Sequence, residues 1–313
     1  MKWADRIGRR IKLRDLHVLH AVAQAGSMTK AAGQLAISVP VVSKAIAELE
    51  HTVGVPLLDR SPQGVEPTAY GQALLRRGLA AFDELRQGVR DIESLMDPTA
   101  GEVRVASTAP LAGSFVCGVI DRLSRRYPRI VLYPTVADTE GMRRELDERR
   151  VDLLVARRFS RLAEEFNFEG LYDNRYVVMA GAKNPWVRRR KVELADLMDE
   201  PWVLPSPQSS VGTFIGEAFR SQGLDFPRAA VVAFAYEVRV SLLATNRYLT
   251  VLPESVLQFP ATHQRIKMLP LELRLRRMPI GIITVKGRTL SPAAQLFIDT
   301  ARDIAKPLAM RKA

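Results

Sequence analysis

Cysteine is almost absent from this chain of 313 residues, and this absence restricts its chemistry. Because Cys117 is the only cysteine, the chain forms no internal disulfide, and a zinc site built from several cysteines is excluded. The residues around Cys117 form an apolar, helical stretch, which favours a thiol packed in a core over a redox sensor.

Histidine is scarce as well, and the common catalytic motifs are missing. The four histidines are His17, His20, His51 and His263. His17 and His20 share a predicted helix but have no third ligand nearby, so surface or packed histidines are favoured over a metal site. No GxSxG, GxGxxG or Walker loop occurs. We therefore predict that the chain is not an enzyme and holds no cofactor or metal.

Long apolar runs are also missing. Apolar residues make up 47% of the chain, but no run approaches the roughly 20 residues that a membrane span needs. The first residues, MKWADRIGRRIKLRD, are charged and lack the apolar core of a secretory signal. The sequence thus predicts a cytoplasmic protein without membrane contact.

Acidic residues are outnumbered, and the formal net charge is +12. Residues 1–97 contribute only +2 of this, with thirteen basic against eleven acidic residues. We interpret the remaining excess as solvated surface, because it comes from short arginine clusters: Arg125-Arg126, Arg149-Arg150, Arg157-Arg158 and Arg188-Arg189-Arg190-Lys191.

The stretch from Gly26 to Glu50 predicts two short helices joined by a tight turn. Gly26 is expected to end the preceding helix, Ser27 to cap the first of the pair, and Ser38 to cap the second, with Pro40 in its first turn. One buried stripe is predicted at Val42, Ile46, Leu49 and Val53. The opposite face is small or basic: Val39, Ser43, Lys44 and Ala47. Such a pair fits a DNA major groove, although an ordinary helical hairpin has the same periodicity.

The flanking sequence favours the DNA-binding alternative. Residues 13–25 predict a third helix, with Leu16, Leu19 and Ala23 on one face, and residues 57–68 predict a small β-wing. Arg60 would stand on this wing, where it could meet a phosphate. Residues 1–44 hold eight basic residues against two acidic ones, which places positive charge where the predicted recognition surface begins.

Four phrases in this region, AVAQAGSMTKAAGQLAIS, VVSKAIAELE, GVPLLDR and PTAYG, resemble the winged helix-turn-helix of LysR-type transcriptional regulators. The resemblance implies a DNA-binding domain over residues 11–68, with the helix-turn-helix at about 28–47. Val39 and Ala45 stand where family members usually carry polar residues, so contact with thymine methyl groups or shape readout must contribute more. The expected DNA contacts are Ser27, Thr29, Lys30, Ser38, Val39, Pro40, Ser43, Lys44 and Arg60.

Residues 69–96 predict one long helix with a coiled-coil-like seam. The helix is too long to be covered by a small trihelical unit, so a second copy of the chain explains the seam better than packing on its own domain. The resemblance implies that this linker helix is the dimerisation element, with a palindromic operator as the target and a tetramer as the larger assembly. The seam comprises Leu75, Leu79, Phe82, Leu85, Val89 and Ile92.

Beyond a predicted hinge at residues 97–101, strands alternate with helices, which indicates an α/β fold with parallel strands. Residues 102–313 resemble a periplasmic-binding-protein-like effector domain, in the overall pattern and in phrases such as RVDLLVA, EPWVLP and LTVLPES. We predict one lobe from about residues 102–160 and 267–313 and a second from about 161–266. The strands are expected at 102–106, 130–134, 151–156, 176–180, 202–205, 229–234, 249–253 and 280–285.

Ligands of open α/β sheets bind outside the carboxyl ends of the strands. Applied to these strands, the rule selects hydroxyl and aromatic side chains, and some lie at helix starts, where the helix dipole favours an anion. The resemblance implies effector contacts at the same positions. A small organic acid suits this set, and so does a sugar. The predicted contacts are Ser107, Thr108, Thr139, Ser209, Ser210, Thr213, Phe234 and Tyr236.

We therefore predict a LysR-type regulator whose DNA binding or activation responds to a small molecule between two lobes, and which contacts RNA polymerase when activating. A solute-binding protein or enzyme with an added helical domain would require an export signal or a catalytic cluster. A DNA-bridging protein without a ligand would leave the two lobes unexplained.

Overall fold

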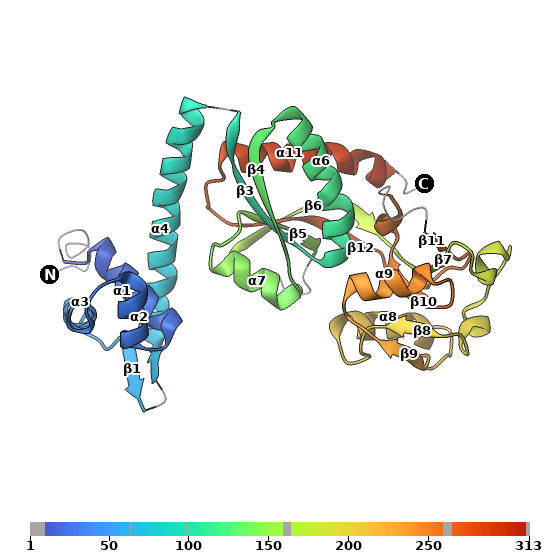
Figure 1. The fold of residues 1–313 in the computed structure, drawn as a ribbon, viewed down its shortest axis with the longest axis horizontal. Helices are drawn as coiled ribbons and strands as arrows, with labels where there is room; N and C mark the ends of the chain where they lie inside the picture. Colours follow the sequence, from blue (N-terminus) through green and yellow to red (C-terminus); the bar gives the residue numbers. More distant parts are fainter. Residues whose placement is uncertain (1–9, 63, 98, 159–163, 259–264, 311–313) are drawn as a thin grey trace. The chain divides into compact units, whose positions relative to one another are not determined.

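The computed structural model describes residues 10–62, 64–97, 99–158, 164–258 and 265–310. The chain folds into two compact units, Met1–Val89 and Arg90–Ala313 (Figure 1). Each unit has its own hydrophobic core.

The first unit is a trihelical domain with a wing. Its elements are α1 (Leu13–Ala25), α2 (Met28–Leu35), α3 (Val39–Val53), the antiparallel pair β1 (Leu58–Ser61) and β2 (Gly64–Pro67), and most of α4 (Ala69–Met96), whose residues from Arg90 onward belong to the second unit. Gly26 ends α1 with a φ of 62°, and the Ser27 side chain accepts a hydrogen bond from the Lys30 backbone N–H at the start of α2. Ser38 occupies the N-cap position of α3, but its side chain makes no capping hydrogen bond, contrary to the prediction.

The core of this unit contains the predicted stripe of α3. Val42, Ile46 and Leu49 are at most 1% exposed and Val53 is 7% exposed. Helix α1 buries Val18, Leu19, Ala21 and Val22, whereas Leu16 and Ala23 of its predicted face are only half-buried. Among the described residues no single helix is long and apolar enough to cross a membrane; α2 and α3 meet that test only as a pair bent by 109°.

Two contacts fix the wing to the helices. The Glu50 carboxylate at the end of α3 accepts hydrogen bonds from the backbone N–H groups of Leu57 and Leu58, at 2.8 and 3.2 Å. On the other strand, the Val65 N–H donates to the Gly26 carbonyl at 2.9 Å. The wing is thus anchored both to the second helix of the pair and to the turn that precedes the first.

The predicted seam of α4 divides into two parts. Leu75 packs against the trihelical core, and the Phe82 ring lies 6.0 Å from the His17 ring, centroid to centroid. Leu85, Val89 and Ile92 are instead 53%, 56% and 59% exposed. Packing on its own domain therefore accounts for Leu75 and Phe82, and only the later part of the helix presents an open apolar face.

The second unit contains two five-stranded sheets, and the first sheet has the strand order β4-β3-β5-β12-β6. Its strands are β3 (Ala100–Ser107), β4 (Arg129–Val136), β5 (Leu153–Arg157), β6 (Phe166–Asn174) and β12 (Met278–Val285). Strands β4, β3 and β5 are parallel, and β12 runs antiparallel to both β5 and β6. One face carries α6 (Cys117–Arg126) and α11 (Pro292–Met310), and the other carries α7 (Thr139–Asp147) (Figure 1). Strand β3 leads through α5 (Ala109–Leu111) and a π-helical turn, Ala112–Val116, into α6.

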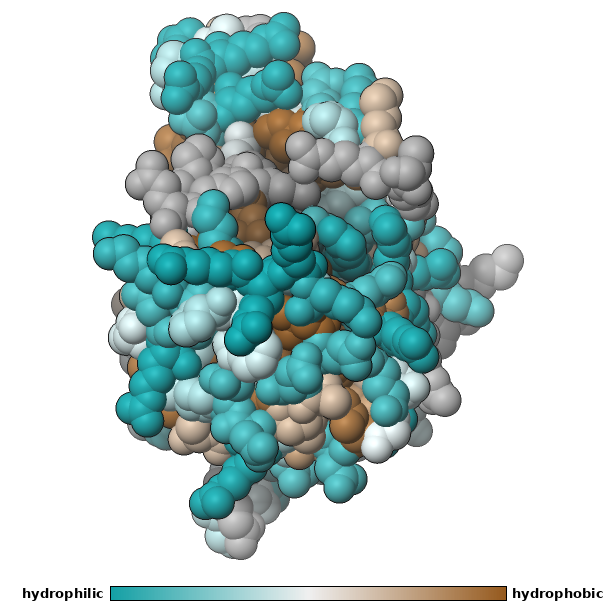
Figure 2. Space-filling model, turned by 90° about the vertical axis from the view of Figure 1, so that its right-hand side faces the viewer, coloured by the Kyte–Doolittle hydropathy of each residue, from teal (hydrophilic) through white to brown (hydrophobic). Residues whose placement is uncertain are grey.

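The second sheet has the order β11-β7-β10-β8-β9. Its strands are β7 (Tyr176–Gly181), β8 (Trp202–Leu204), β9 (Ala229–Val232), β10 (Leu249–Pro253) and β11 (Ile266–Met268). Helix α8 (Ser210–Arg220) packs on one face, and α9 (Tyr236–Ala244) with the 3-10 segment Glu254–Gln258 packs on the other. The face of the molecule shown in Figure 2 is largely hydrophilic. The cluster Arg188–Lys191, which was predicted to be solvated, is exposed.

The sheets correct the predicted lobe boundaries. Strand β6, which the sequence analysis missed, belongs to the first sheet, although residues 161–266 were assigned to the second lobe. Strand β11 belongs to the second sheet, and Leu269, Leu271 and Leu273 pack in that lobe's core, although residues from 267 onward were assigned to the first. The predicted boundary near 160 and Pro98 of the predicted hinge lie outside the described residues. Cys117 is exposed and not packed in the core, because it falls on the solvent side at the start of α6.

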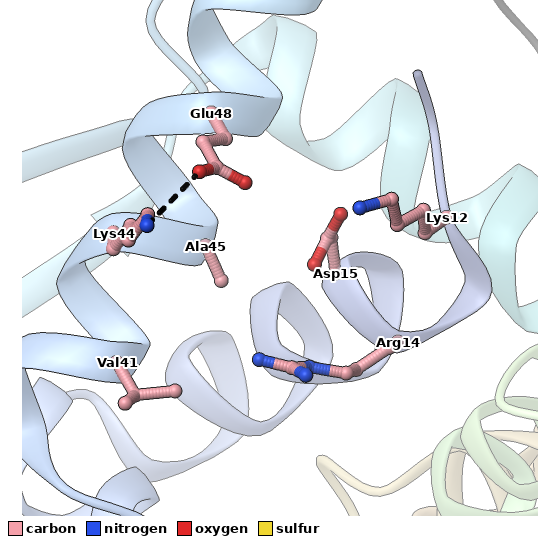
Figure 3. A pocket seen from close by; sticks show the side chains of 7 residues that line it. All are labelled: Lys12, Arg14, Asp15, Val41, Lys44, Ala45 and Glu48. Atoms are coloured by element: carbon pink, nitrogen blue, oxygen red, sulfur yellow. Dashed lines mark ion pairs between the residues drawn. The ribbon is translucent and has the colours of Figure 1, made fainter. Parts of the chain in front are cut away.

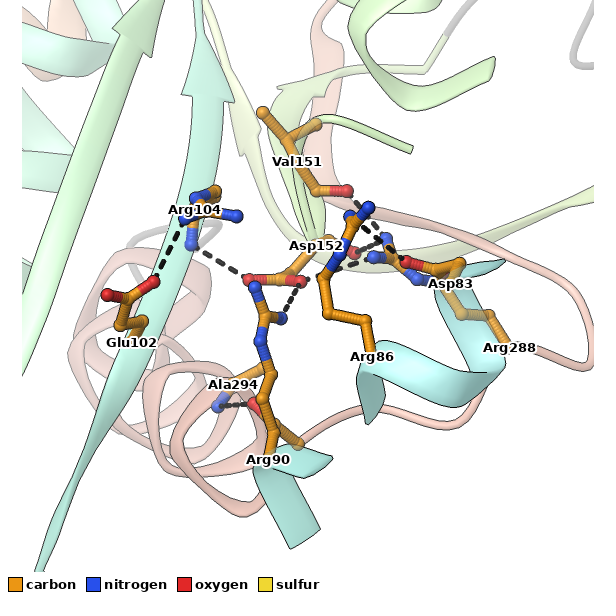
Figure 4. A network of polar contacts seen from close by, with 10 residues as sticks. Asp83, Arg86, Arg90, Glu102, Arg104, Val151, Asp152, Arg288 and Ala294 are labelled. Atoms are coloured by element: carbon orange, nitrogen blue, oxygen red, sulfur yellow. Dashed lines mark hydrogen bonds and ion pairs between the residues drawn. The ribbon is translucent and has the colours of Figure 1, made fainter. Parts of the chain in front are cut away.

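One buried carboxylate joins the start of the second unit to its first sheet (Figure 4). Asp152, 2% exposed, accepts hydrogen bonds from the backbone N–H of Arg104 at 2.9 Å and from Arg90 Nη1 at 3.0 Å. Arg288 Nη2 lies 3.3 Å from the same carboxylate, and Arg288 Nη1 donates to the Val151 carbonyl at 2.5 Å. The end of α4, strand β3 and the loop after β12 therefore meet at one side chain.

We expect the substitution Asp152→Ala to lower the free energy of unfolding by about 3 kcal/mol or more, because removing one partner of a buried ion pair leaves the other charges uncompensated. Urea denaturation followed by circular dichroism measures the change. Asp121→Ala is the control, since Asp121 pairs with Arg125 on the surface of α6 and both side chains are more than half exposed. Equal effects of the two substitutions would contradict a stabilising role for the Asp152 network.

Candidate DNA-binding and effector sites

The surface of the first unit presents most of the predicted DNA contacts to solvent. Ser38, Val39 and Pro40 are exposed at the start of α3, Thr29 and Lys30 are exposed on α2, and Arg60 is exposed on the wing. Lys44 is exposed one turn further along α3, and Ser43 is half-buried. Ser27 is half-buried and its hydroxyl caps α2, so this side chain also has a structural role. These residues form a small surface, partly basic and partly apolar, around the start of α3.

A hollow beside this surface lies between the start of α1 and the outer face of α3 (Figure 3). Lys12, Arg14, Val41 and Lys44 line it, together with Asp15 and Glu48. The Lys44 ammonium lies 3.8 Å from the Glu48 carboxylate, and both side chains are more than half exposed. A pair this exposed is weak, so Lys44 remains available to a phosphate. Lys12 and Arg14 were not among the predicted contacts, although basic residues at the start of the first helix are a visible signal in the sequence.

The structure changes the interpretation of Ala45. Its side chain is 4% exposed and packs in the trihelical core with Val42 and Ile46. The alanine at this position is therefore a packing residue, and it is not a lost base-reading group as the sequence analysis inferred. Val39 differs, since it is 38% exposed and stands at the first position of α3.

In the first lobe, the predicted effector residues lie at the carboxyl ends of strands. Ser107 is the last residue of β3 and is 1% exposed, and Thr108 follows at the N-cap position of α5, half-buried. Thr139 is the first residue of α7 and is half-buried. The cap of that helix is supplied by Asp138, which accepts a hydrogen bond from the Gly141 N–H at 2.7 Å.

In the second lobe, two of the predicted hydroxyls are used within the fold. Ser209 caps α8 by accepting from the Gly212 N–H, and it donates to the Ser206 carbonyl at 2.7 Å. Thr213 donates to the Pro207 carbonyl at 3.1 Å. Ser210 is exposed, and Arg157 Nη2 of the first lobe lies 3.4 Å from its hydroxyl oxygen.

The two predicted aromatic residues differ in their surroundings. Phe234 is 62% exposed. Tyr236 is half-buried at the start of α9, and its ring lies close to Gly113 of the first lobe, where a Cβ would come within 3.6 Å of it. Tyr236 therefore lies where the two lobes approach each other, as Arg157 and Ser210 do.

Three further side chains gather here that the sequence analysis did not select: Arg157, Tyr176 and Arg239. Arg157 ends β5 and is half-buried, which corrects its assignment to the solvated surface. Tyr176 begins β7, and because β7 runs antiparallel to β10, its first residue lies opposite Pro253, at the carboxyl end of β10. Burial raises the pKa of the Tyr176 phenol, and the charges of Arg157 and Arg239 act in the opposite direction.

Arg239 lies on α9, three residues after Tyr236, and is 5% exposed. Its Nε and Nη2 donate to the Thr250 hydroxyl at 3.0 and 2.8 Å, and Nη2 also donates to the Val251 carbonyl. Burial lowers the pKa of its guanidinium to about 10. Arg157 directly follows the predicted strand at residues 151–156, so the strand-end rule could have selected it. The periodicity of the helix around Arg239 did not indicate that this side chain is buried.

Comparison with known proteins gives the same division of the chain. The family model of the bacterial regulatory helix-turn-helix protein of the LysR family matches residues 13–72. The model of the LysR substrate binding domain matches residues 97–306. The two matches cover the first unit and the two-sheet unit.

Relatives match over nearly the whole chain. The regulator GbpR of Azospirillum brasilense is 26% identical over 97% of this chain and 89% of its own length. The small neutral protease regulatory protein of Streptomyces coelicolor is 29% identical over 92% of this chain and 85% of its own length.

Solved structures share the fold. ArgP from Mycobacterium tuberculosis has a TM-score of 0.69 at 19% identity, covering 94% of this chain and 97% of its own. The LysR regulator CbnR in complex with its target DNA has a TM-score of 0.53 at 22% identity, covering 94% of this chain and all of its own. Since a family model matches well over half of its length, the chain belongs to the LysR family of transcriptional regulators, which bind DNA through a helix-turn-helix and an effector through the substrate-binding domain.

Proposed function

We propose that this regulator reads its operator through the first turn of α3 and holds the DNA backbone through basic residues around it. The observation that carries the proposal is the exposed start of α3, where Val39 and Pro40 project beside Lys44. Val39 would contact a thymine methyl group, and Lys44, Lys30 and Arg60 would neutralise phosphates. The remaining proposed contacts are Ser27, Thr29, Ser38 and Ser43.

Two copies would bind a palindromic site, because paired recognition helices spaced by turns of the duplex read symmetric half-sites. The exposed residues Leu85, Val89 and Ile92 of α4 support a helix–helix interface between copies. Leu75, Leu79 and Phe82 of the predicted seam would contribute less, since they are half-buried and two of them contact their own domain. A tetramer would combine two such dimers.

An effector bound between the lobes would act by population shift. It would stabilise the arrangement of the lobes in which it contacts both of them. Ser107, Thr108, Thr139, Ser210 and Tyr236 support this position. Ser209, Thr213 and Phe234 would have secondary roles. The change in lobe arrangement would alter how dimers pack on DNA, and the activating state would contact RNA polymerase. The chain would act by binding, without catalysis.

The function is tested by binding of the purified full-length protein to DNA from upstream of its own gene, across a salt series and with a panel of small acids and sugars. Sequence-selective, salt-dependent binding that one compound alters is the expected result. Equal binding to the upstream fragment and to random fragments would contradict the proposal that α3 reads a specific operator.

We expect Lys44→Ala to weaken binding to all DNA sequences and to reduce the slope of log affinity against log salt by about 1, because one phosphate contact is lost. Fluorescence anisotropy with operator and random duplexes measures both quantities. Lys306→Ala is the matched control, since Lys306 is likewise exposed and pairs with a carboxylate, Asp303, on its own helix. A loss confined to the operator duplex would assign Lys44 to base reading.

We expect Val89→Glu to shift the protein from dimer toward a monomer of 34.9 kDa, because the carboxylate would place a charge in the centre of the helix–helix contact. Analytical ultracentrifugation across a concentration series measures the shift. Ala73→Glu introduces the same charge at an exposed position of the same helix and should leave the mass unchanged. An unchanged mass for Val89→Glu would place the dimer contact elsewhere.

A further inference from the structure

The two buried arginines of the described chain differ in their partners. Arg288, 8% exposed, lies 3.3 Å from the Asp152 carboxylate. Arg239, 5% exposed, hydrogen-bonds only a hydroxyl and a carbonyl, and in the described ranges no carboxylate forms an ion pair with it. A buried charge without a countercharge is costly, and an anion from outside the chain would relieve that cost. Nη1 of Arg239 takes part in none of these hydrogen bonds and is the donor left for such an anion.

A second guanidinium approaches from the other lobe. Arg157 lies at the carboxyl end of β5, half-buried, and its one hydrogen bond in the described chain is the long contact of 3.4 Å to Ser210 on α8. No carboxylate of the described residues forms an ion pair with Arg157 either. Many of the other arginines of this unit do pair with acids, for example Arg175 with Glu254 and Arg302 with Glu169.

Tyr176 connects the two guanidinium groups in space. Its ring packs 5.1 Å from the Phe214 ring, centroid to centroid, and Phe214 is one turn along α8 from Ser210. Both Arg157 and Arg239 are close enough for their charges to act on the Tyr176 phenol. Tyr236, on the helix that carries Arg239, faces Gly113 of the first lobe. Positive charge from both lobes therefore converges beside two phenol groups.

The donor set favours an oxyanion over a neutral sugar. A guanidinium offers only hydrogen-bond donors, in a planar fork that matches a carboxylate, and it has no acceptor for a sugar hydroxyl proton. Resting on the effector function proposed above, we infer that the inter-lobe site binds a small carboxylic acid as its anion, with Arg157 and Arg239 as the charge partners from the two lobes. The phenols of Tyr176 and Tyr236 and the hydroxyl of Ser210 border the same anion.

The experiment compares acids with their neutral amides on the full-length protein. Acetate, succinate and benzoate are each tested against the corresponding amide, and glucose and inorganic phosphate are included, with thermal stability and calorimetric affinity as readouts. At least one carboxylate should raise the melting temperature while its amide does not. Stabilisation by glucose or phosphate with none by the carboxylates would overturn the inference and leave the effector function standing.

The matched variants are Arg157→Gln and Arg158→Gln. Arg158 is exposed and directly follows Arg157, but its guanidinium lies over the Phe168 ring within the first lobe. Arg157→Gln should weaken carboxylate binding about tenfold or more, and Arg158→Gln should leave it unchanged. Equal affinity in the two variants would overturn the inference.

A third variant, Arg239→Lys, keeps the charge and loses the Nη1 donor. Its carboxylate affinity should fall, and its circular dichroism spectrum shows whether it folds. Carboxylate binding that depends on Arg157 but does not change DNA affinity would support the inference and contradict the proposed effector function, so the two failures are distinguishable.

Discussion

The order of the second unit depends on the burial of one negative charge, that of Asp152. A carboxylate removed from water is tolerated only when charged or hydrogen-bonding groups replace its hydration, and here a backbone N–H and two guanidinium groups do so. Those groups come from the end of α4, from β3 and from the segment after β12. The last turns of the linker helix are therefore held to the same sheet whose strand ends reach the proposed effector site. Strand β3 and the last turns of α4 thus share one carboxylate.

The sequence predicted the parts of the fold in which local signals agree with tertiary packing. Capping residues, the apolar stripe of α3 and the alternation of strands and helices beyond residue 101 all placed elements where the structure has them. Strand β6 was missed although Phe166 and Phe168 alternate with Asn167 and Glu169, because Gly170 interrupts this alternation after four residues. Its place in the first sheet depends on pairing with β12, more than one hundred residues later, which no local pattern reveals.

The candidate sites were likewise predicted only in part, because a local pattern does not reveal which other segments a side chain contacts. The rule that ligands bind at strand carboxyl ends led to Ser107, Thr108 and Ser210, which lie there. The hydroxyl of Ser209 instead caps α8, and the hydroxyl of Thr213 donates to the Pro207 carbonyl before that helix. The rule did not select Tyr176, because Tyr176 is the first residue of β7. It reaches the carboxyl end of β10 only because β7 runs antiparallel to β10. Ala45 shows the reverse error: the position was interpreted as one that lacks a base-reading group, but its side chain packs in the core.

The second lobe begins and ends at neighbouring points of the first sheet. Asn174, the last residue of β6, is the register partner of Met278, the first residue of β12, and the chain between them forms the whole second sheet. In architectural terms the lobe is an insertion in one hairpin of a complete five-stranded sheet. Exchange of the segment between these two residues would retain every strand of the first sheet and its Asp152 junction. The fold thus allows ligand preference to change when this inserted segment is replaced, while the contacts of Asp152 with the last turns of α4 are retained.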